Sequence, residues 1–193
     1  MADEVVENFR PTSGRITGVI ALVLVAAVVA IGVLDREQGY PPTVVWAALV
    51  VGVLVWSAML RPRMWATTSD LVMRNMLSTV SIPLAAIEQV LVRQVVAVRA
   101  GDQRYVCPAV GKSWRQTIRS DKKPAKPDAA VPYATFVEER LHQLTEEARA
   151  RAGVALLSDK QIALADGVRR DWAWPEIAAL AVTTVGLVVA LVR

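Results

Sequence analysis

ITGVIALVLVAAVVAIGVL, residues 16–34, contains no ionisable side chain and is the first of three such stretches in the chain. The second is residues 43–60, TVVWAALVVGVLVWSAML, and the third is residues 177–192, IAALAVTTVGLVVALV. A helix needs about 20 apolar residues to cross the hydrocarbon core of a bilayer, and its backbone groups must bond within the helix itself. The sequence therefore predicts three transmembrane helices around a more polar middle.

The first two stretches are separated by a short segment, residues 35–42, which ends in Pro41 and Pro42 and predicts the turn of a membrane hairpin. A cleaved signal peptide is disfavoured because the apolar run is long and no small-residue cleavage pattern follows it. The third stretch is shorter, so a buried helix is the alternative there. Pro175 and Glu176 suit the first turn of a helix, which favours a third span.

Arginines beside the apolar stretches predict the orientation in the cell (inner) membrane, because cytoplasmic flanks hold the excess of positive charge. The hairpin turn carries one arginine, whereas three other flanks carry two each: Arg10 and Arg15, Arg61 and Arg63, Arg169 and Arg170. The N-terminus and the middle of the chain are therefore expected in the cytoplasm, and the C-terminus outside.

This pattern divides the chain into three parts. Residues 1–60 form an N-terminal tail and a two-helix membrane hairpin, residues 61–171 form one cytoplasmic domain, and residues 172–193 form the C-terminal transmembrane helix. Short valine-rich runs in the domain predict an antiparallel β-sheet. The expected strands are residues 64–69, 71–74, 79–82, 88–99 and 104–110, with an irregular or helical turn at 83–87.

Residues 135–152 predict one helix that covers the sheet. Thr135 and Glu138 have the spacing of a capping box, and Gly153 is placed to end the helix. The apolar stripe of this helix consists of Val137, Leu141, Leu144 and Ala148. Residues 154–165 have two possible interpretations: they add an edge strand to the sheet, or they only connect the helix to the last span.

Positive charge is the strongest indication of a binding surface. Residues 61–171 hold 18 Lys or Arg and 12 Asp or Glu, a net charge of +6. Much of the excess lies in a segment, residues 112–132, with little that a core would bury. Its candidate lipid- or partner-binding residues are Lys112, Arg115, Arg119, Lys122, Lys123 and Lys126. Each cation near an anionic leaflet gains up to about 1 kcal/mol. The alternative is solvated charge that only sets membrane topology.

Enzyme chemistry finds no support in the residue pattern. Cys107 is the only cysteine and His142 the only histidine, so no metal site, cofactor site or catalytic constellation is predicted. We expect Cys107 to be a buried strand residue and His142 to be solvated. The apolar stretches carry no ionisable group in their middle, which disfavours a transporter, a proton channel or an intramembrane enzyme. Nucleic acid is disfavoured as a partner because the basic segment lacks interleaved aromatic residues.

The start of the domain resembles the bacterial PH-like domains of actinobacterial membrane proteins. The resemblance rests on residues 61–75, RPRMWATTSDLVMRN, followed by Ser81-Ile82-Pro83-Leu84 and Ile87; Leu84 stands where the family usually has an aromatic residue. It implies a bent antiparallel sheet capped by a helix, used for binding phosphoinositides, peptides or proteins, without enzyme activity.

The expected fold class is thus an α+β membrane protein with three transmembrane helices, a small PH-like sheet and one capping helix. The expected function is a non-enzymatic membrane-anchored scaffold or accessory subunit that binds a membrane-associated protein. The alternative is a module that binds anionic phospholipid through residues 112–126.

Overall fold

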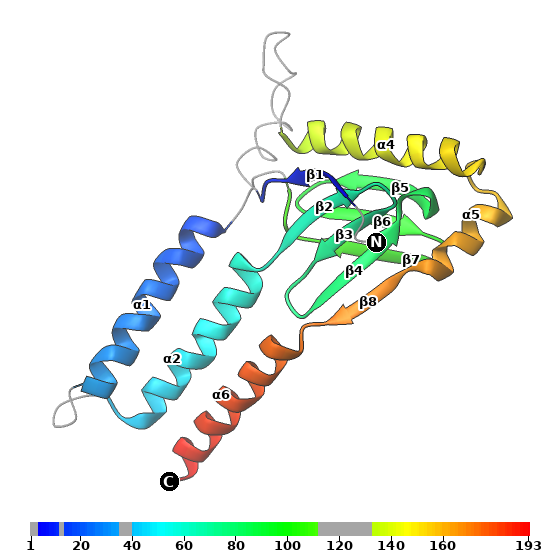
Figure 1. Cartoon of the computed structure of the whole chain (residues 1–193). Helices are drawn as coiled ribbons and strands as arrows, with labels where there is room; N and C mark the ends of the chain where they lie inside the picture. The colour runs from blue at the N-terminus through cyan, green and yellow to red at the C-terminus, as the bar shows by residue number, and fades with distance from the viewer. Residues whose placement is uncertain (1–3, 12–13, 35–39, 112–132) are drawn as a thin grey trace, which may run out of the picture. The chain divides into compact units, whose positions relative to one another are not determined.

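The computed structural model describes residues 4–11, 14–34, 40–111 and 133–193, which divide between two compact units (Figure 1). The helical unit contains α1, α2, η1 and α6, and the sheet unit contains the strands with α4 and α5. Each unit is described by itself.

Three helices of the helical unit are long and apolar enough to cross a membrane. They are α1 (Arg15–Leu34), α2 (Pro42–Val55) continued by the π-helical turn η1 (Trp56–Leu60), and α6 (Trp174–Val192). The three predicted spans are thereby confirmed as membrane-length helices. The π-helical turn was not predicted: the Arg61 N–H donates to the Trp56 carbonyl, 3.0 Å away and five residues back.

Within the helical unit, α2 packs against both α1 and α6. Glycines allow the close approach on each side. A Cβ added at Gly52 would meet Val25 of α1, and one added at Gly186 would meet the ring of Trp46 in α2. Arg61, directly after η1, donates from Nε to Glu176 Oε1 of α6 at 2.6 Å. Small residues thus pack the helices of one chain together, with an ion pair joining the end of η1 to the start of α6.

Among the described residues, eight strands form two antiparallel sheets. The first has the order β1-β2-β3-β4-β8, with β1 (Val5–Phe9), β2 (Arg63–Thr67), β3 (Asp70–Arg74), β4 (Ser78–Pro83) and β8 (Arg169–Trp172). The second has the order β5-β6-β7, with β5 (Ile87–Val92), β6 (Val96–Ala100) and β7 (Gln103–Cys107). The 3-10 turn η2 (Leu84–Ala86) leads from β4 into β5, as the irregular turn at 83–87 predicted.

Two strands lie where none was predicted. β1 belongs to the N-terminal tail and pairs with β2, and the Phe9 side chain is 1% exposed. β8 follows residues 154–165, which form no edge strand; they hold α5 (Asp159–Leu164) and the start of the 3-10 turn η3 (Ala165–Gly167). Both strands pair with residues far away in sequence, so no local pattern announced them.

The prediction of one strand over residues 88–99 was wrong, because β5 and β6 are separated by a turn at 93–95. That turn contains no Gly, Pro, Asn or Asp, the usual signals for a reversal. It is accommodated instead by Gly111, where a side chain would collide with the Gln94 carbonyl. The reversal therefore depends on a residue outside the hairpin.

The predicted covering helix is α4 (Tyr133–Ala152), which packs on η2 and β5. Its stripe of Val137, Leu141, Leu144 and Ala148 is buried as expected, and Gly153 ends it with φ at 63°. The capping box at Thr135 was wrong because the helix begins at Tyr133, which places Thr135 inside the first turn. Ala134, before the predicted start, is also buried at 4% exposure, so the buried face of the helix includes a residue that the predicted stripe left out.

Candidate interaction surfaces

The predicted basic cluster lies outside the described residues. Lys112, Arg115, Arg119, Lys122, Lys123 and Lys126 all fall within residues 112–132. Their role as a lipid- or partner-binding site therefore stays a prediction, and the described residues supply the other candidate surfaces.

The outer face of the β5-β6-β7 sheet carries a shallow cavity of about 430 Å³. Cross-strand register places Arg99 directly opposite Arg104, and two like charges in that position repel. Arg99 is partly balanced by Glu88, whose Oε2 lies 3.6 Å from Arg99 Nε. The lining residues are Gln89, Leu91, Ala97, Val98, Arg99, Asp102, Gln103 and Arg104. Charges of both signs over an apolar floor make this a polar surface without one clear ligand.

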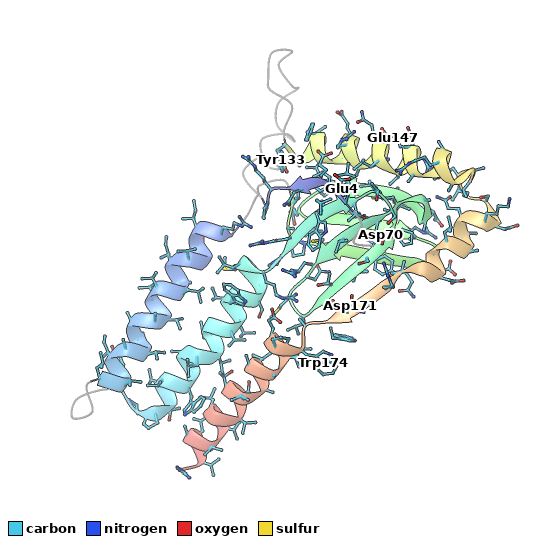
Figure 2. All side chains as sticks on the ribbon, viewed as in Figure 1. Glu4, Asp70, Tyr133, Glu147, Asp171 and Trp174 are labelled. Carbon is cyan, nitrogen blue, oxygen red and sulfur yellow. The ribbon has the colours of Figure 1, made fainter. Side chains whose placement is uncertain are left out.

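An aromatic pair lies at the start of α4, where Figure 2 shows Tyr133. The rings of Tyr133 and Phe136 stack with their centroids 6.2 Å apart, and Phe136 is 47% exposed. The Tyr133 hydroxyl accepts from the Arg10 N–H at 2.7 Å. About two turns further along α4, Arg140 Nε donates to Glu7 Oε2 of β1 at 2.6 Å, and this bond raises the pKa of the guanidinium. β1 and α4 are thus held together by side-chain bonds.

A third surface lies between α4 and α5, where Leu156, Leu157 and Ile162 are all exposed. We refer to these three residues as the leucine knob. Behind it, Gln161 is fully buried and bonded on both sides of its carboxamide. This surface was not predicted from the sequence. The available signal was Ser158 three residues before Gln161, the spacing of a capping box.

The helical unit has an apolar cleft of about 400 Å³ along α2. Its lining residues are Val25, Leu49, Gly52, Val53, Trp56, Pro175, Glu176 and Ala179, of which only Glu176 is ionisable. That carboxylate is already bonded to Arg61. In a bilayer such a cleft meets lipid chains or another helix with equal ease, so it indicates no particular ligand.

Cys107 and His142, the one cysteine and the one histidine in the sequence, lie in different surroundings. Cys107 is fully buried in β7, as predicted, and burial raises the pKa of its thiol to about 11. A thiol in this state is protonated at neutral pH and is a poor nucleophile. His142 is exposed on α4, as predicted. Over the residues that the structure describes, no group of three or more His, Cys, Asp or Glu side chains is arranged to hold a metal ion.

The fold and surfaces of the described residues define the class of this protein: an α+β chain with three membrane-length helices, two antiparallel sheets and exposed apolar side chains on the sheet unit. Comparison with protein-family models, with curated proteins and with solved structures finds no match to the chain.

Proposed function

We propose that this protein is a non-enzymatic, membrane-anchored scaffold or accessory subunit, whose PH-like sheet unit binds a membrane-associated protein at the cytoplasmic face of the cell membrane. The observation that carries the proposal is exposed apolar surface on the sheet unit, outside the three membrane-length helices. Among the described residues, its exposed large apolar side chains include Val5, Val6, Leu91, Val106, Phe136, Leu156, Leu157 and Ile162. A patch of exposed apolar side chains lowers the solubility of a protein. Such patches are typical of surfaces that another molecule covers.

The PH-like part of the proposal is supported by the resemblance at residues 61–87 together with the order of elements. Antiparallel strands come first and a helix with a buried apolar stripe follows, packed on β5. Sheets of this kind present faces, edges and loops to ligands without needing catalytic groups. Function on such a scaffold lies in the exposed surfaces rather than in the fold itself.

The cytoplasmic placement is supported by the arginine pairs beside the three helices. Arg10 and Arg15, Arg61 and Arg63, and Arg169 and Arg170 lie on the flanks that would face the cytoplasm if all three helices cross the membrane. With that orientation the sheet unit meets cytoplasmic and membrane-associated proteins.

The second candidate is an anionic-lipid module that uses residues 112–126. The net charge of +6 on residues 61–171 favours it, because cations held near an anionic leaflet gain energy without a shaped pocket. The two candidates differ in what they require: a protein partner of fixed stoichiometry, or an anionic headgroup of any origin.

Purification of the full chain from its own membranes in a mild detergent separates the candidates. A single protein that stays with the chain at constant ratio through two purification steps supports the scaffold. For the lipid module, the full chain is placed in nanodiscs with and without anionic lipid, and hydrogen exchange of residues 112–126 is measured. Protection that requires anionic lipid, and that disappears with salt or with Lys122→Gln, Lys123→Gln and Lys126→Gln, supports the alternative.

If no protein is retained and exchange of residues 112–126 is the same in both kinds of nanodisc, both candidates are wrong. The full chain is required because β1, formed by residues 5–9, pairs with β2 and contributes Phe9 to the core. A fragment that begins at residue 61 would lack this strand.

A further inference from the structure

The connection between α4 and α5 exposes large apolar side chains at consecutive positions. Leu156 is 54% exposed and Leu157 69% exposed, and Ile162 on α5 is 50% exposed. Single exposed leucines are ordinary on protein surfaces, whereas a cluster of them marks an interaction site or an aggregation hazard. The leucine knob is therefore a feature that needs a physical reason.

The backbone at Leu157 is held in an unfavourable conformation. Its φ is 59°, in the left-handed region that Gly and Asn adopt easily and other residues seldom adopt. Within the part of the chain that the structure describes, no other non-glycine residue has a positive φ. Strain of this kind persists only where the surrounding structure imposes it, and it gathers at functional sites.

Gln161 imposes the conformation. The Leu157 N–H donates to Gln161 Oε1 at 2.6 Å, while Gln161 Nε2 donates to the carbonyls of Ala85 at 3.2 Å and Ile87 at 3.1 Å. Gln161 is itself fully buried, and its bond to the Ile87 carbonyl is shielded from water. Ser158 Oγ accepts from the Gln161 N–H at 3.3 Å and caps α5. The knob is thus fixed to the start of β5 through one buried carboxamide.

The same cap places two knob residues together. With Ser158 as N-cap, Leu157 and Ile162 occupy the two positions that pair in a hydrophobic staple. When the two side chains of a staple bury each other, the staple stabilises only the start of its own helix. Here each of the two side chains keeps half or more of its surface exposed, so the pair presents apolar surface outward.

We propose that the leucine knob, Leu156, Leu157 and Ile162, inserts into an apolar pocket of a protein partner. The proposal rests on the proposed scaffold function and names the surface that performs it. Because the knob is already held in one conformation, it loses little conformational entropy on binding. The strain at Leu157 is thus offset by preorganisation for the partner. The charged residues close to the knob in sequence carry both signs, which suits the polar rim of a protein interface; they are Arg149, Arg151, Asp159, Lys160 and Asp166. An anionic membrane would instead favour a cationic surround.

A photo-crosslinking amino acid at position 157 of the full chain, in its own membranes, tests where the knob docks. The expected result is one discrete adduct with a different protein, lost when Leu156→Ser is added. Val106, on the outer face of the β5-β6-β7 sheet, and Glu146, on the exposed side of α4, are the control positions. An adduct with lipid only, or with a second copy of the chain, overturns the proposal.

The control positions also separate the knob from the scaffold function. A protein adduct at position 106 or 146 but none at position 157 overturns the knob and keeps the scaffold. The absence of a protein adduct at all three positions, with no protein retained in mild detergent, overturns both.

Leu157→Asn then distinguishes docking from folding, because Asn tolerates positive φ but removes the apolar side chain. With the crosslinked protein purified as the probe, we expect the full chain carrying Leu157→Asn to bind about tenfold more weakly or worse. Its melting temperature should stay within a few degrees of the parent. Unchanged affinity overturns the proposal. If the melting temperature of Leu157→Asn is much lower, the affinity is measured instead with Leu156→Ser, a substitution at an exposed position. Unchanged affinity of Leu156→Ser also overturns the proposal.

Discussion

Gln161 shows how a single side chain can set both a loop and a sheet edge. It is 0% exposed, and its carboxamide bonds to one N–H before α5 and to two carbonyls, one within η2 and one at the start of β5. The Ile87 carbonyl also accepts from Arg149 at 3.4 Å, so it keeps a partner without Gln161, whereas Leu157 N–H and Ala85 C=O lose the bonds that Gln161 makes to them.

Gln161→Leu should lower the free energy of unfolding of the sheet unit by about 1–3 kcal/mol, because buried backbone groups lose their partners. Denaturant unfolding of the full chain in detergent measures the change. Gln89→Leu, the same substitution on an exposed residue of β5, is the control and should stay within about 0.5 kcal/mol of the parent. Equal effects of the two variants would contradict the role given to Gln161.

The buried thiol of Cys107 should lower the free energy of unfolding at alkaline pH. Burial raises the pKa of its thiol from 9.0 to about 11, so the unfolded chain releases the proton near pH 9 while the folded chain keeps it to about pH 11. Unfolding therefore becomes easier as pH rises through this window, by about 3 kcal/mol in total. Below pH 9 the contribution is fully present.

Unfolding free energies of the parent and of Cys107→Ala, measured from pH 8 to pH 11, isolate this contribution. The parent should lose stability more steeply than the variant, whose other titrating groups are the same. Parallel pH curves would show that the thiol does not titrate as its burial requires.

At the scale of elements, β1 shows that the N-terminal tail is part of the sheet unit. Phe9 is 1% exposed in the core, whereas Val6 on the same strand is 46% exposed. The strand is also bonded to α4 through Glu7 and Arg140 and through Arg10 and Tyr133. Its place in the sheet is therefore supported by core burial, strand pairing and side-chain bonds.

Phe9→Ala should destabilise the sheet unit by about 3–5 kcal/mol, since a large core side chain is removed. Val6→Ala, in the same strand, should change stability by less than about 0.5 kcal/mol. Amide hydrogen exchange of β2, read with each variant, locates the effect. A Phe9→Ala variant as stable as Val6→Ala would mean that β1 is not part of the folded unit.

Elements with a strong local pattern were predictable, and elements that depend on distant partners were not. The stripe Val137, Leu141, Leu144 and Ala148 predicted α4, and its ending at Gly153 was confirmed. The helix start was missed because the Tyr133 hydroxyl bonds to the Arg10 N–H and Ala134 is buried, and neither contact leaves a local pattern in the sequence. The turn at 93–95 was missed because Gly111, outside the hairpin, makes room for it.

At the scale of the whole molecule, the membrane topology of the chain can be tested. All three helices are of membrane length, and the arginine flanks predict a cytoplasmic sheet unit and an outside C-terminus. Glu146→Cys and Arg193→Cys place one exposed thiol on each side. The parent is the control, since its one thiol, Cys107, is fully buried.

In intact cells, a membrane-impermeant maleimide should label Arg193→Cys and leave Glu146→Cys unlabelled until the cells are permeabilised. The chain should also stay in the membrane fraction after an alkaline wash. The reverse labelling pattern, or release of the chain by alkali, would contradict the proposed orientation or the membrane anchoring itself.

The sequence by itself determined the three membrane-length helices, most strands of the sheet unit and the buried face of α4. These elements follow from uninterrupted apolar runs and from apolar periodicities, both of which are local features of the sequence. Only the tertiary structure decided β1, β8, the reversal at 93–95 and the strained leucine knob. Each depends on partners remote in sequence, as when Gln161 bonds to Ile87 across 74 residues, and a contact of that range leaves no local pattern to read.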